Sequence, residues 1–105
     1  MAVFVFAYRS TQDYNSTPEG VTEWRAWFEG LGEHVVELGQ PAAAAASVGN
    51  CDTESTHLGG YSLISADDLE SAMALTKGCP QLTRGGGIEI GQLVPVPAAV
   101  SSAAE

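Results

Sequence analysis

The sequence predicts a single α+β domain whose elements follow the order β-α-β-β-α-β. Three observations lead to this prediction: an apolar strand opens the chain, two amphipathic segments carry helix-start signals, and a glycine-containing strand precedes the second of these segments. With 105 residues the chain is long enough to bury one core and too short for two. We expect the domain to span residues 1–97, with residues 98–105 as a flexible tail.

The first strand is predicted at Val3–Tyr8, which is rich in β-branched and aromatic residues. Alternate side chains of a strand point to opposite faces of a sheet. Both faces of this strand are apolar, with Phe4, Phe6 and Tyr8 on one face and Val3, Val5 and Ala7 on the other. We therefore expect something to cover each side of the sheet.

The first helix is predicted from about Pro18 to Leu31. Thr17-Pro18-Glu19 supplies an N-cap hydroxyl, a proline at the first helical position and an acidic first turn, and Gly32 provides a terminator. Apolar residues recur at helical spacing and form one broad stripe, which comprises Val21, Trp24, Trp27, Phe28 and Leu31. We expect this stripe to pack on the sheet.

Two strands separated by a long loop follow the first helix. A short strand is predicted at Glu33–Leu38 and the third strand at Leu58–Ile64. Between them, Pro41–His57 shows neither the helix period nor the strand period over most of its length, although Ala42–Ala46 could form a helical turn. A loop this long in so small a domain is either functional or mobile.

The second helix is expected to follow a capping box at Ser65–Asp68 and to end at Lys77-Gly78, before Pro80. Its apolar side comprises Leu69, Ala72, Met73 and Thr76. The alternation of Ile88–Val94 then predicts a fourth strand. This order is that of a ferredoxin-like domain, with an antiparallel four-stranded sheet and two helices on one face. We expect a second copy of the chain to cover the other face in a sheet-to-sheet homodimer.

Composition excludes several classes of function. Thirteen acidic residues face four basic ones, which gives a formal net charge of −9. Nucleic acids and anionic membranes are both bound by clustered Lys and Arg, so we expect neither partner. No segment approaches the roughly 20 apolar residues of a membrane-spanning helix. Two cysteines without a C-x-x-C pair indicate a reducing, cytoplasmic compartment, and we expect no metal and no cofactor.

Several segments resemble the YCII-related proteins of bacteria. The run Gly59–Ala72 is similar to their glycine-glycine-tyrosine strand followed by an acidic helix start. Shorter similarities occur in matching order at Thr17-Pro18-Glu19, Val36–Pro41 and Gly86–Ile90. The resemblance covers about residues 2–97 and implies a ferredoxin-like dimer of the dimeric α/β-barrel kind, with a cleft beside each sheet.

The resemblance also bears on chemistry. Some YCII-related proteins use a histidine of the first helix and an aspartate of the following hairpin for acid–base reactions on small ring compounds. In this chain the matching helix position holds Trp24, and that helix has no histidine. The Asp-Gly-Pro-Phe motif of another branch is replaced by Val48–Cys51. The resemblance therefore implies the scaffold and not the family's mechanism.

His57 is the strongest candidate for a general acid or base, because histidine titrates near neutrality. It ends the long loop, with Asp52 close enough in sequence to orient it, and Tyr61 could donate a proton or clamp a substrate. The alternative is a solvated loop histidine. For His34, a surface or interface role is the expected one. A nucleophilic Cys51 is disfavoured, because neighbouring acidic residues raise the pKa of a thiol.

Ligand binding has its own candidates. Tyr8 and Arg9 end the first strand near the strand that carries Tyr61, and an arginine near two phenols could bind a carboxylate or a phenolate. Trp24 and Phe28 could line an apolar pocket against the sheet. The alternative in each case is that the aromatic side chains belong to the core or to the dimer interface.

Two functions fit these observations. The first is a cofactor-free acid–base enzyme of the isomerase, lyase or dehydrohalogenase type, acting on a small aromatic or carboxylated metabolite. The second is a non-catalytic dimeric module that binds a small molecule or a protein.

The glycine run Gly85-Gly86-Gly87 precedes a strand and lacks Gly-Lys-Ser/Thr, so we interpret it as a turn and not as a phosphate loop.

Overall fold

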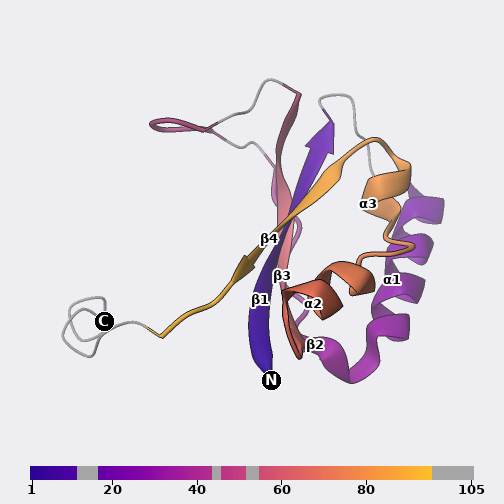
Figure 1. Ribbon diagram of the computed structural model, residues 1–105. Helices are drawn as coiled ribbons and strands as arrows, with labels where there is room; N and C mark the ends of the chain where they lie inside the picture. The colour runs from indigo at the N-terminus through magenta and orange to yellow at the C-terminus, as the bar shows by residue number, and fades with distance from the viewer. Residues whose placement is uncertain (12–16, 44–45, 52–54, 96–105) are drawn as a thin grey trace.

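The four strands form one antiparallel sheet in the order β2-β3-β1-β4, which is the ferredoxin-like order predicted from the sequence. The computed structural model describes residues 1–11, 17–43, 46–51 and 55–95. The elements, in chain order, are β1 (Ala2–Thr11), α1 (Pro18–Leu31), a 3-10 turn (Gly32–His34), β2 (Val35–Glu37), β3 (Thr56–Ala66), α2 (Leu69–Leu75), α3 (Pro80–Thr83) and β4 (Gly87–Gln92). The helices lie on one side of the sheet (Figure 1).

A bulge in β3 sets which side chains reach which face. Strand β1 pairs with β3 in steady register from Ala2 opposite Ala66 to Tyr8 opposite Gly60, and the register then shifts so that Arg9 lies opposite Leu58. The extra residue is Gly59, where a Cβ would lie 2.1 Å from the Ser10 hydroxyl oxygen. Only glycine fits so close an approach of strand and side chain.

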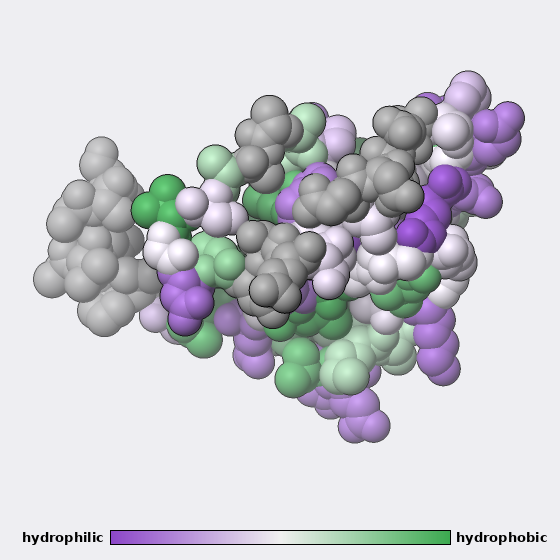
Figure 2. All heavy atoms as spheres, turned by 90° about the horizontal axis from the view of Figure 1, so that it is seen from above, coloured by the Kyte–Doolittle hydropathy of each residue, from purple (hydrophilic) through white to green (hydrophobic). Residues whose placement is uncertain are grey.

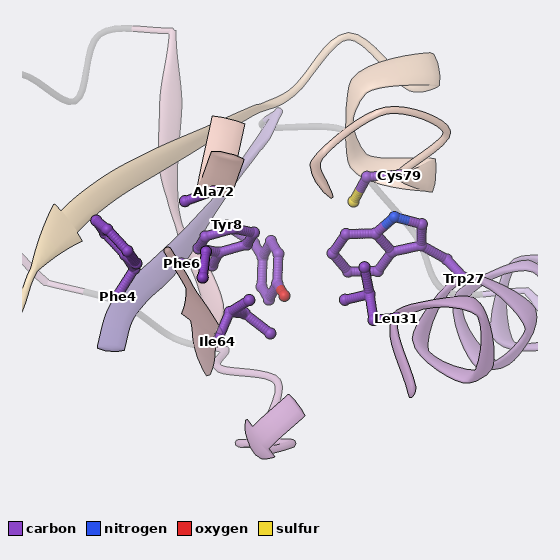
Figure 3. Close-up of a cluster of buried hydrophobic side chains, with 9 residues drawn as sticks. Phe4, Phe6, Tyr8, Trp27, Leu31, Ile64, Ala72 and Cys79 are labelled. Atoms are coloured by element: carbon purple, nitrogen blue, oxygen red, sulfur yellow. The ribbon is translucent and has the colours of Figure 1, made fainter. Parts of the chain in front are cut away.

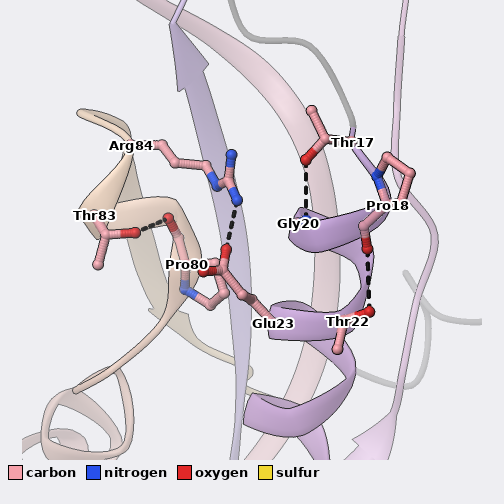
Figure 4. Close-up of polar contacts among 8 residues, drawn as sticks. All are labelled: Thr17, Pro18, Gly20, Thr22, Glu23, Pro80, Thr83 and Arg84. Carbon is pink, nitrogen blue, oxygen red and sulfur yellow. Dashed lines mark hydrogen bonds and ion pairs between the residues drawn. The ribbon is translucent and has the colours of Figure 1, made fainter.

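The start of α1 follows its predicted cap. The hydroxyl of Thr17 accepts a hydrogen bond from the backbone N–H of Gly20 at 3.0 Å, as Figure 4 shows, and Pro18 occupies the first turn. Gly32 ends the helix at a positive φ of 58°, a conformation that glycine adopts without strain. The boundaries predicted for this helix are therefore confirmed.

The start of α2 corrects the predicted capping box. Asp68 is the N-cap, and its carboxylate accepts a hydrogen bond from the N–H of Ser71 at 2.8 Å. Ser65 instead lies in β3, and its hydroxyl donates to the backbone carbonyl of His34 at 3.3 Å. Because β3 runs to Ala66, the prediction of a helix cap at Ser65 was wrong.

The core lies between the sheet and the helices (Figure 3). Phe4, Phe6 and Tyr8 project from β1 toward the helices, as their alternation predicts, and all three are buried. On α1 the buried apolar residues are Trp27 and Leu31. Full burial of a large apolar side chain contributes about 1.5–3 kcal/mol of folding free energy, so this face of β1 stabilises the fold more than any cap does.

The stripe predicted on α1 is shifted. Trp27 is its buried centre, whereas Val21 is 47% exposed and Trp24 and Phe28 are half-buried. The second helix shows the same pattern, since Ala72 is buried while Leu69 and Met73 are exposed. Helical spacing identifies the apolar side of a helix, but the neighbouring elements decide which of its residues are covered.

Helix α3 was not predicted. Pro80 was interpreted as a stop after the second helix, but it occupies the first turn of a four-residue helix. An ion pair joins Arg84, just after α3, to Glu23 on α1 (Figure 4). The pair is partly exposed and so contributes little by itself, but it fixes where the end of α3 lies against α1.

The other face of the sheet carries no helix in the described parts of the chain (Figure 1). Val3, Val5 and Leu63 on this face are half-buried, and Leu58 and Tyr61 are exposed. The predicted homodimer would cover this surface and stays a prediction. The predicted tail at 98–105 lies outside the described residues, as do Ala44 and Ala45 of the predicted helical turn, while Ala42, Ala43 and Ala46 belong to no helix. Among the described residues, no helix is long and apolar enough to cross a membrane.

Candidate functional site

A cavity of about 290 Å³ lies between α1 and the part of the sheet where β3 meets the segment after β2. Its apolar wall is formed by Val21, Trp24 and Phe28 of α1 together with Leu38. Its polar side chains come from elements far apart in the sequence, namely Tyr8 and Ser10 of β1, Gln40, Ser62 of β3 and Gln81 of α3. The partial exposure of Val21, Trp24 and Phe28 is therefore explained by the cavity beside them.

The aromatic side chains of this wall hold one another in place. The rings of Tyr8 and Trp24 meet edge to face with centroids 4.9 Å apart, and the centroid of Trp24 lies 5.8 Å from that of Phe28. Trp27 contacts all three from the buried side. Aromatic contacts of this kind contribute roughly 0.5–1.5 kcal/mol each beyond burial, so they favour one arrangement of these rings.

Two hydroxyl groups form a chain at the base of the cavity. The Tyr8 hydroxyl donates to the Ser62 hydroxyl at 2.9 Å, and the Ser62 hydroxyl donates to the backbone carbonyl of Leu38 at 2.6 Å. Burial raises the pKa of the Tyr8 phenol well above its ordinary value. Tyr8 therefore stays protonated and neutral across the physiological pH range.

Gln81 provides a second polar group. Its side-chain amide donates to the Ser10 hydroxyl at 3.1 Å and to the backbone carbonyl of Arg9. The position of the amide depends on Gly86, where a Cβ would lie 2.6 Å from the Gln81 nitrogen. Sequence reasoning missed Gln81, because α3 was not predicted. The glycine run at 85–87 was the available signal, since glycines that precede a strand often mark a close approach of another group.

The wall opposite α1 is built from backbone. The segment Gly39–Pro41 folds against β3, where Tyr61 N donates to Gln40 O at 3.2 Å and Ala42 N donates to Gly59 O at 3.0 Å. Gly39 has a φ of 78°, and a Cβ there would lie 1.8 Å from the Tyr61 carbonyl oxygen. No other residue fits at this position without moving the wall.

Four of the predicted site residues line the cavity: Tyr8, Trp24, Phe28 and Tyr61. Tyr8 and Tyr61 do not form a pair, because Tyr61 lies opposite Ala7 and the two tyrosines point to opposite faces of the sheet. The Tyr61 hydroxyl donates to Glu37 at 2.8 Å, and this hydrogen bond raises the pKa of the Tyr61 phenol. The predicted grouping of Arg9 with two phenols on one face is therefore not assembled.

Arg9 and His57 lie outside the lining of the cavity. Arg9 follows Tyr8 on β1 and so faces the other side of the sheet, where its guanidinium donates to the backbone carbonyl of Thr56 at 3.1 Å. His57 belongs to β3 rather than to a loop, lies opposite Ser10, and has its Nδ1 3.2 Å from the carbonyl oxygen of Leu58. Asp52, the predicted partner of His57, lies outside the described residues.

In the described part of the chain, the remaining titratable side chains form no other site. His34 uses Nδ1 to donate to the Ser65 carbonyl at 2.8 Å, which makes it a structural link between the 3-10 turn and β3. Cys79 is buried, and burial raises the pKa of its thiol to about 11, so it is a poor nucleophile. Among the residues whose placement is described, no three His, Cys, Asp or Glu side chains are grouped to hold a metal ion. In the view of Figure 2, apolar side chains gather on the surface below the centre, and hydrophilic ones lie mainly along the right and lower edges.

Comparison with known proteins supports the fold. No family model matches the chain, and no curated protein matches it. A solved structure that resembles it is 5-chloro-2-hydroxyhydroquinone dehydrochlorinase (TftG) from Burkholderia phenoliruptrix AC1100, in complex with 2,5-dihydroxybenzoquinone. The TM-score is 0.57 at 16% sequence identity, and the similarity covers 90% of this chain and 95% of that one. A distant structural neighbour with the same fold is therefore a dehydrochlorinase.

Proposed function

We propose that this protein binds a small, largely apolar ring compound in the cavity between α1 and the sheet. The observation that carries the proposal is the cavity itself, about 290 Å³ with aromatic side chains on one wall and a few polar groups at its base. Cavities of this composition are the usual form of small-molecule sites. An apolar cavity of roughly 150 Å³ is enough to hold benzene, so this one has room for one substituted ring.

The test is to fill the cavity without disturbing the core. Val21 is exposed enough for a larger side chain to be accepted, so we expect Val21→Trp to block the cavity and to leave the fold intact. Ala26→Trp, on the exposed side of the same helix, is the matched control. Binding of 4-ethylphenol, followed by ligand-observed NMR, should be lost in the first variant and kept in the second. Equal binding by both variants would contradict the proposed site.

The second candidate function is acid–base catalysis on a small ring compound at His57 of β3, which lies outside the lining of the cavity. One observation favours it, because the structural neighbour is described as a dehydrochlorinase. In this proposal His57 is the base, Asp52 orients it, and Tyr61 is a proton donor. Chloride release from 5-chloro-2-hydroxyhydroquinone, measured with an ion-selective electrode, tests the reaction. Loss of release in His57→Ala and in Asp52→Asn would support the assignment, and unchanged release in both would remove it.

We also propose that the chain is a YCII-related homodimer that joins its subunits through the open faces of their sheets. Support comes from the half-buried Val3, Val5 and Leu63 on a face without helices. The free thiols of Cys51 and Cys79 suit a reducing, cytoplasmic setting. Light scattering at micromolar concentration should give twice the chain mass of 10.9 kDa. A mass equal to that of one chain would exclude the dimer under those conditions.

A further inference from the structure

We propose that the cavity selects an uncharged ligand that donates a hydrogen bond to Tyr8 and accepts one from Ser10, and that it rejects anions. The inference rests on the proposed function, because it concerns the ligand of the same cavity. It follows from the directions of two hydrogen-bond chains at the base of the cavity, which leave the Tyr8 oxygen as an acceptor and the Ser10 hydroxyl as a donor.

The acceptor is the Tyr8 hydroxyl oxygen. The carbonyl of Leu38 can only accept, so the hydrogen bond between it and Ser62 uses the single hydroxyl proton of Ser62. Ser62 must then accept from Tyr8, and this second bond uses the phenolic proton of Tyr8. The Tyr8 oxygen therefore has lone pairs to offer and no second proton to donate. A ligand group that meets it has to be a donor, such as a hydroxyl or an N–H.

The donor is the Ser10 hydroxyl. The carbonyl of Arg9 can only accept, so the Gln81 side-chain atom that bonds it is the nitrogen, and the orientation of the amide is fixed. The same nitrogen donates to the Ser10 oxygen, and that bond leaves the Ser10 proton unused. Ser10 and Tyr8 are two residues apart on one strand, so they face the cavity side by side. A ligand group that meets Ser10 has to be an acceptor, such as a carbonyl.

Charge strengthens the same selection. Of the described residues that line the cavity, none carries a formal charge, and the cation on β1, Arg9, faces the other side of the sheet. An anion moved into this space would lose its hydration and would gain only neutral donors, such as the Ser10 hydroxyl, in return. The chain's net charge of −9 adds a repulsive field. A carboxylate or phenolate ligand, which the sequence suggested, is therefore disfavoured here.

A matched set of para-substituted benzenes tests the proposal. At pH 6, 4-hydroxyacetophenone offers a hydroxyl donor and a carbonyl acceptor without charge. 4-Hydroxybenzoate replaces the ketone with a carboxylate, 4-methoxyacetophenone removes the donor, and 4-ethylphenol removes the acceptor. Dissociation constants come from calorimetry or NMR titration with the full chain. We expect 4-hydroxyacetophenone to bind most tightly, the carboxylate to bind at least about tenfold more weakly, and the other two to bind about threefold to tenfold more weakly.

Two variants test whether Tyr8 and Ser10 cause these ligand preferences. Tyr8→Phe should remove the preference for 4-hydroxyacetophenone over 4-methoxyacetophenone, because the acceptor is gone. Ser10→Ala should remove the preference for 4-hydroxyacetophenone over 4-ethylphenol, because the donor is gone. Thr76→Ala, which deletes a hydroxyl that donates to Met73 O on the exposed side of α2, is the control and should keep both preferences. Circular dichroism of each variant verifies folding, and ratios of affinities within one variant cancel any general loss of binding.

The outcomes separate the two levels of the proposal. If the rings bind but 4-hydroxybenzoate binds as tightly as 4-hydroxyacetophenone or more tightly, the inference is overturned. The proposed function would still stand. Preferences that persist in Tyr8→Phe and Ser10→Ala would overturn the inference as well. Failure of all four rings to bind the unmodified chain would overturn the proposed function, and the inference with it.

Discussion

The two faces of the sheet are made by the same strands and yet differ in almost every physical property. On the helix side, Phe4, Phe6 and Tyr8 of β1 are buried, and hydrogen bonds join Tyr8 to Ser62 and Gln81 to Ser10. On the open side, Val5 is half-buried, Arg9 bonds to Thr56, and the Tyr61–Glu37 pair is exposed. The alternation of side chains along β1 therefore provides two apolar surfaces. The position of the helices decides which of them becomes the core and carries the cavity.

The largest expected effect on stability comes from truncating one side chain on each face to alanine. Phe6→Ala should lower the free energy of unfolding by about 3–5 kcal/mol, because it leaves a cavity in a fully buried site. Val5→Ala should cost about 1 kcal/mol or less, because its side chain is only half-covered. Urea unfolding followed by tryptophan fluorescence measures both. A Val5→Ala cost that rises with protein concentration would show that a second subunit covers the open face.

A somewhat smaller effect is expected at the backbone wall of the cavity. Gly39→Ala combines a positive φ with a Cβ that would meet the Tyr61 carbonyl, so we expect a loss of about 2–3 kcal/mol. Gly32→Ala is the matched control, because it has a positive φ with open space around the Cβ and should cost only about 1–2 kcal/mol. Thermal and urea unfolding compare the two variants. Equal losses would mean that the wall moves to make room.

Removing one phenol hydroxyl from each face gives a smaller contrast. Tyr8→Phe deletes a buried hydrogen bond to Ser62 and should cost about 0.5–1.5 kcal/mol. Tyr61→Phe deletes a hydrogen bond to Glu37 that is open to water, and we expect no measurable change in stability. The reverse order of costs would mean that Glu37 and Tyr61 are covered in solution.

The smallest effect appears only at alkaline pH. The pKa of Tyr8 and that of Tyr61 are both raised in the folded chain, by burial in the first case and by Glu37 in the second. A raised pKa means that the phenol of the folded chain keeps its proton at pH values at which the same phenol of the unfolded chain has lost it. The contribution to stability is therefore complete below the ordinary tyrosine pKa of about 10 and is lost as the pH rises above it. Ultraviolet titration of the phenolates should show Tyr8 ionising last, together with unfolding, and this late step should vanish in Tyr8→Phe.

Local signals predicted those parts of the fold that depend on neighbouring residues. Thr17, Pro18 and Gly32 act within one helix turn, and they gave both ends of α1. Alternation along β1 gave its two faces for the same reason. The fold class, the four strands and the two longer helices were therefore accessible from sequence patterns.

The cavity depends on pairings between distant residues, and the sequence predicted it only in part. Trp24 and Phe28 were expected in a pocket because they share a helix stripe. Tyr8 and Tyr61 were placed together, whereas the strand register puts their hydroxyls on opposite faces. His57 belongs to β3 and not to the long loop, and Gln81 reaches the site from a helix of only four residues. None of these positions can be derived from one segment without its partner.

The backbone wall at Gly39–Pro41 has a consequence for how the binding preference could change during evolution. The shape of this wall is fixed by main-chain hydrogen bonds and by one glycine, so it does not depend on which side chains face the cavity. The side chains of Val21 and Leu38 are exposed and contribute little to the core. Mutations at these two positions can therefore reshape the cavity while the scaffold remains constant, which makes them suitable targets for directed evolution.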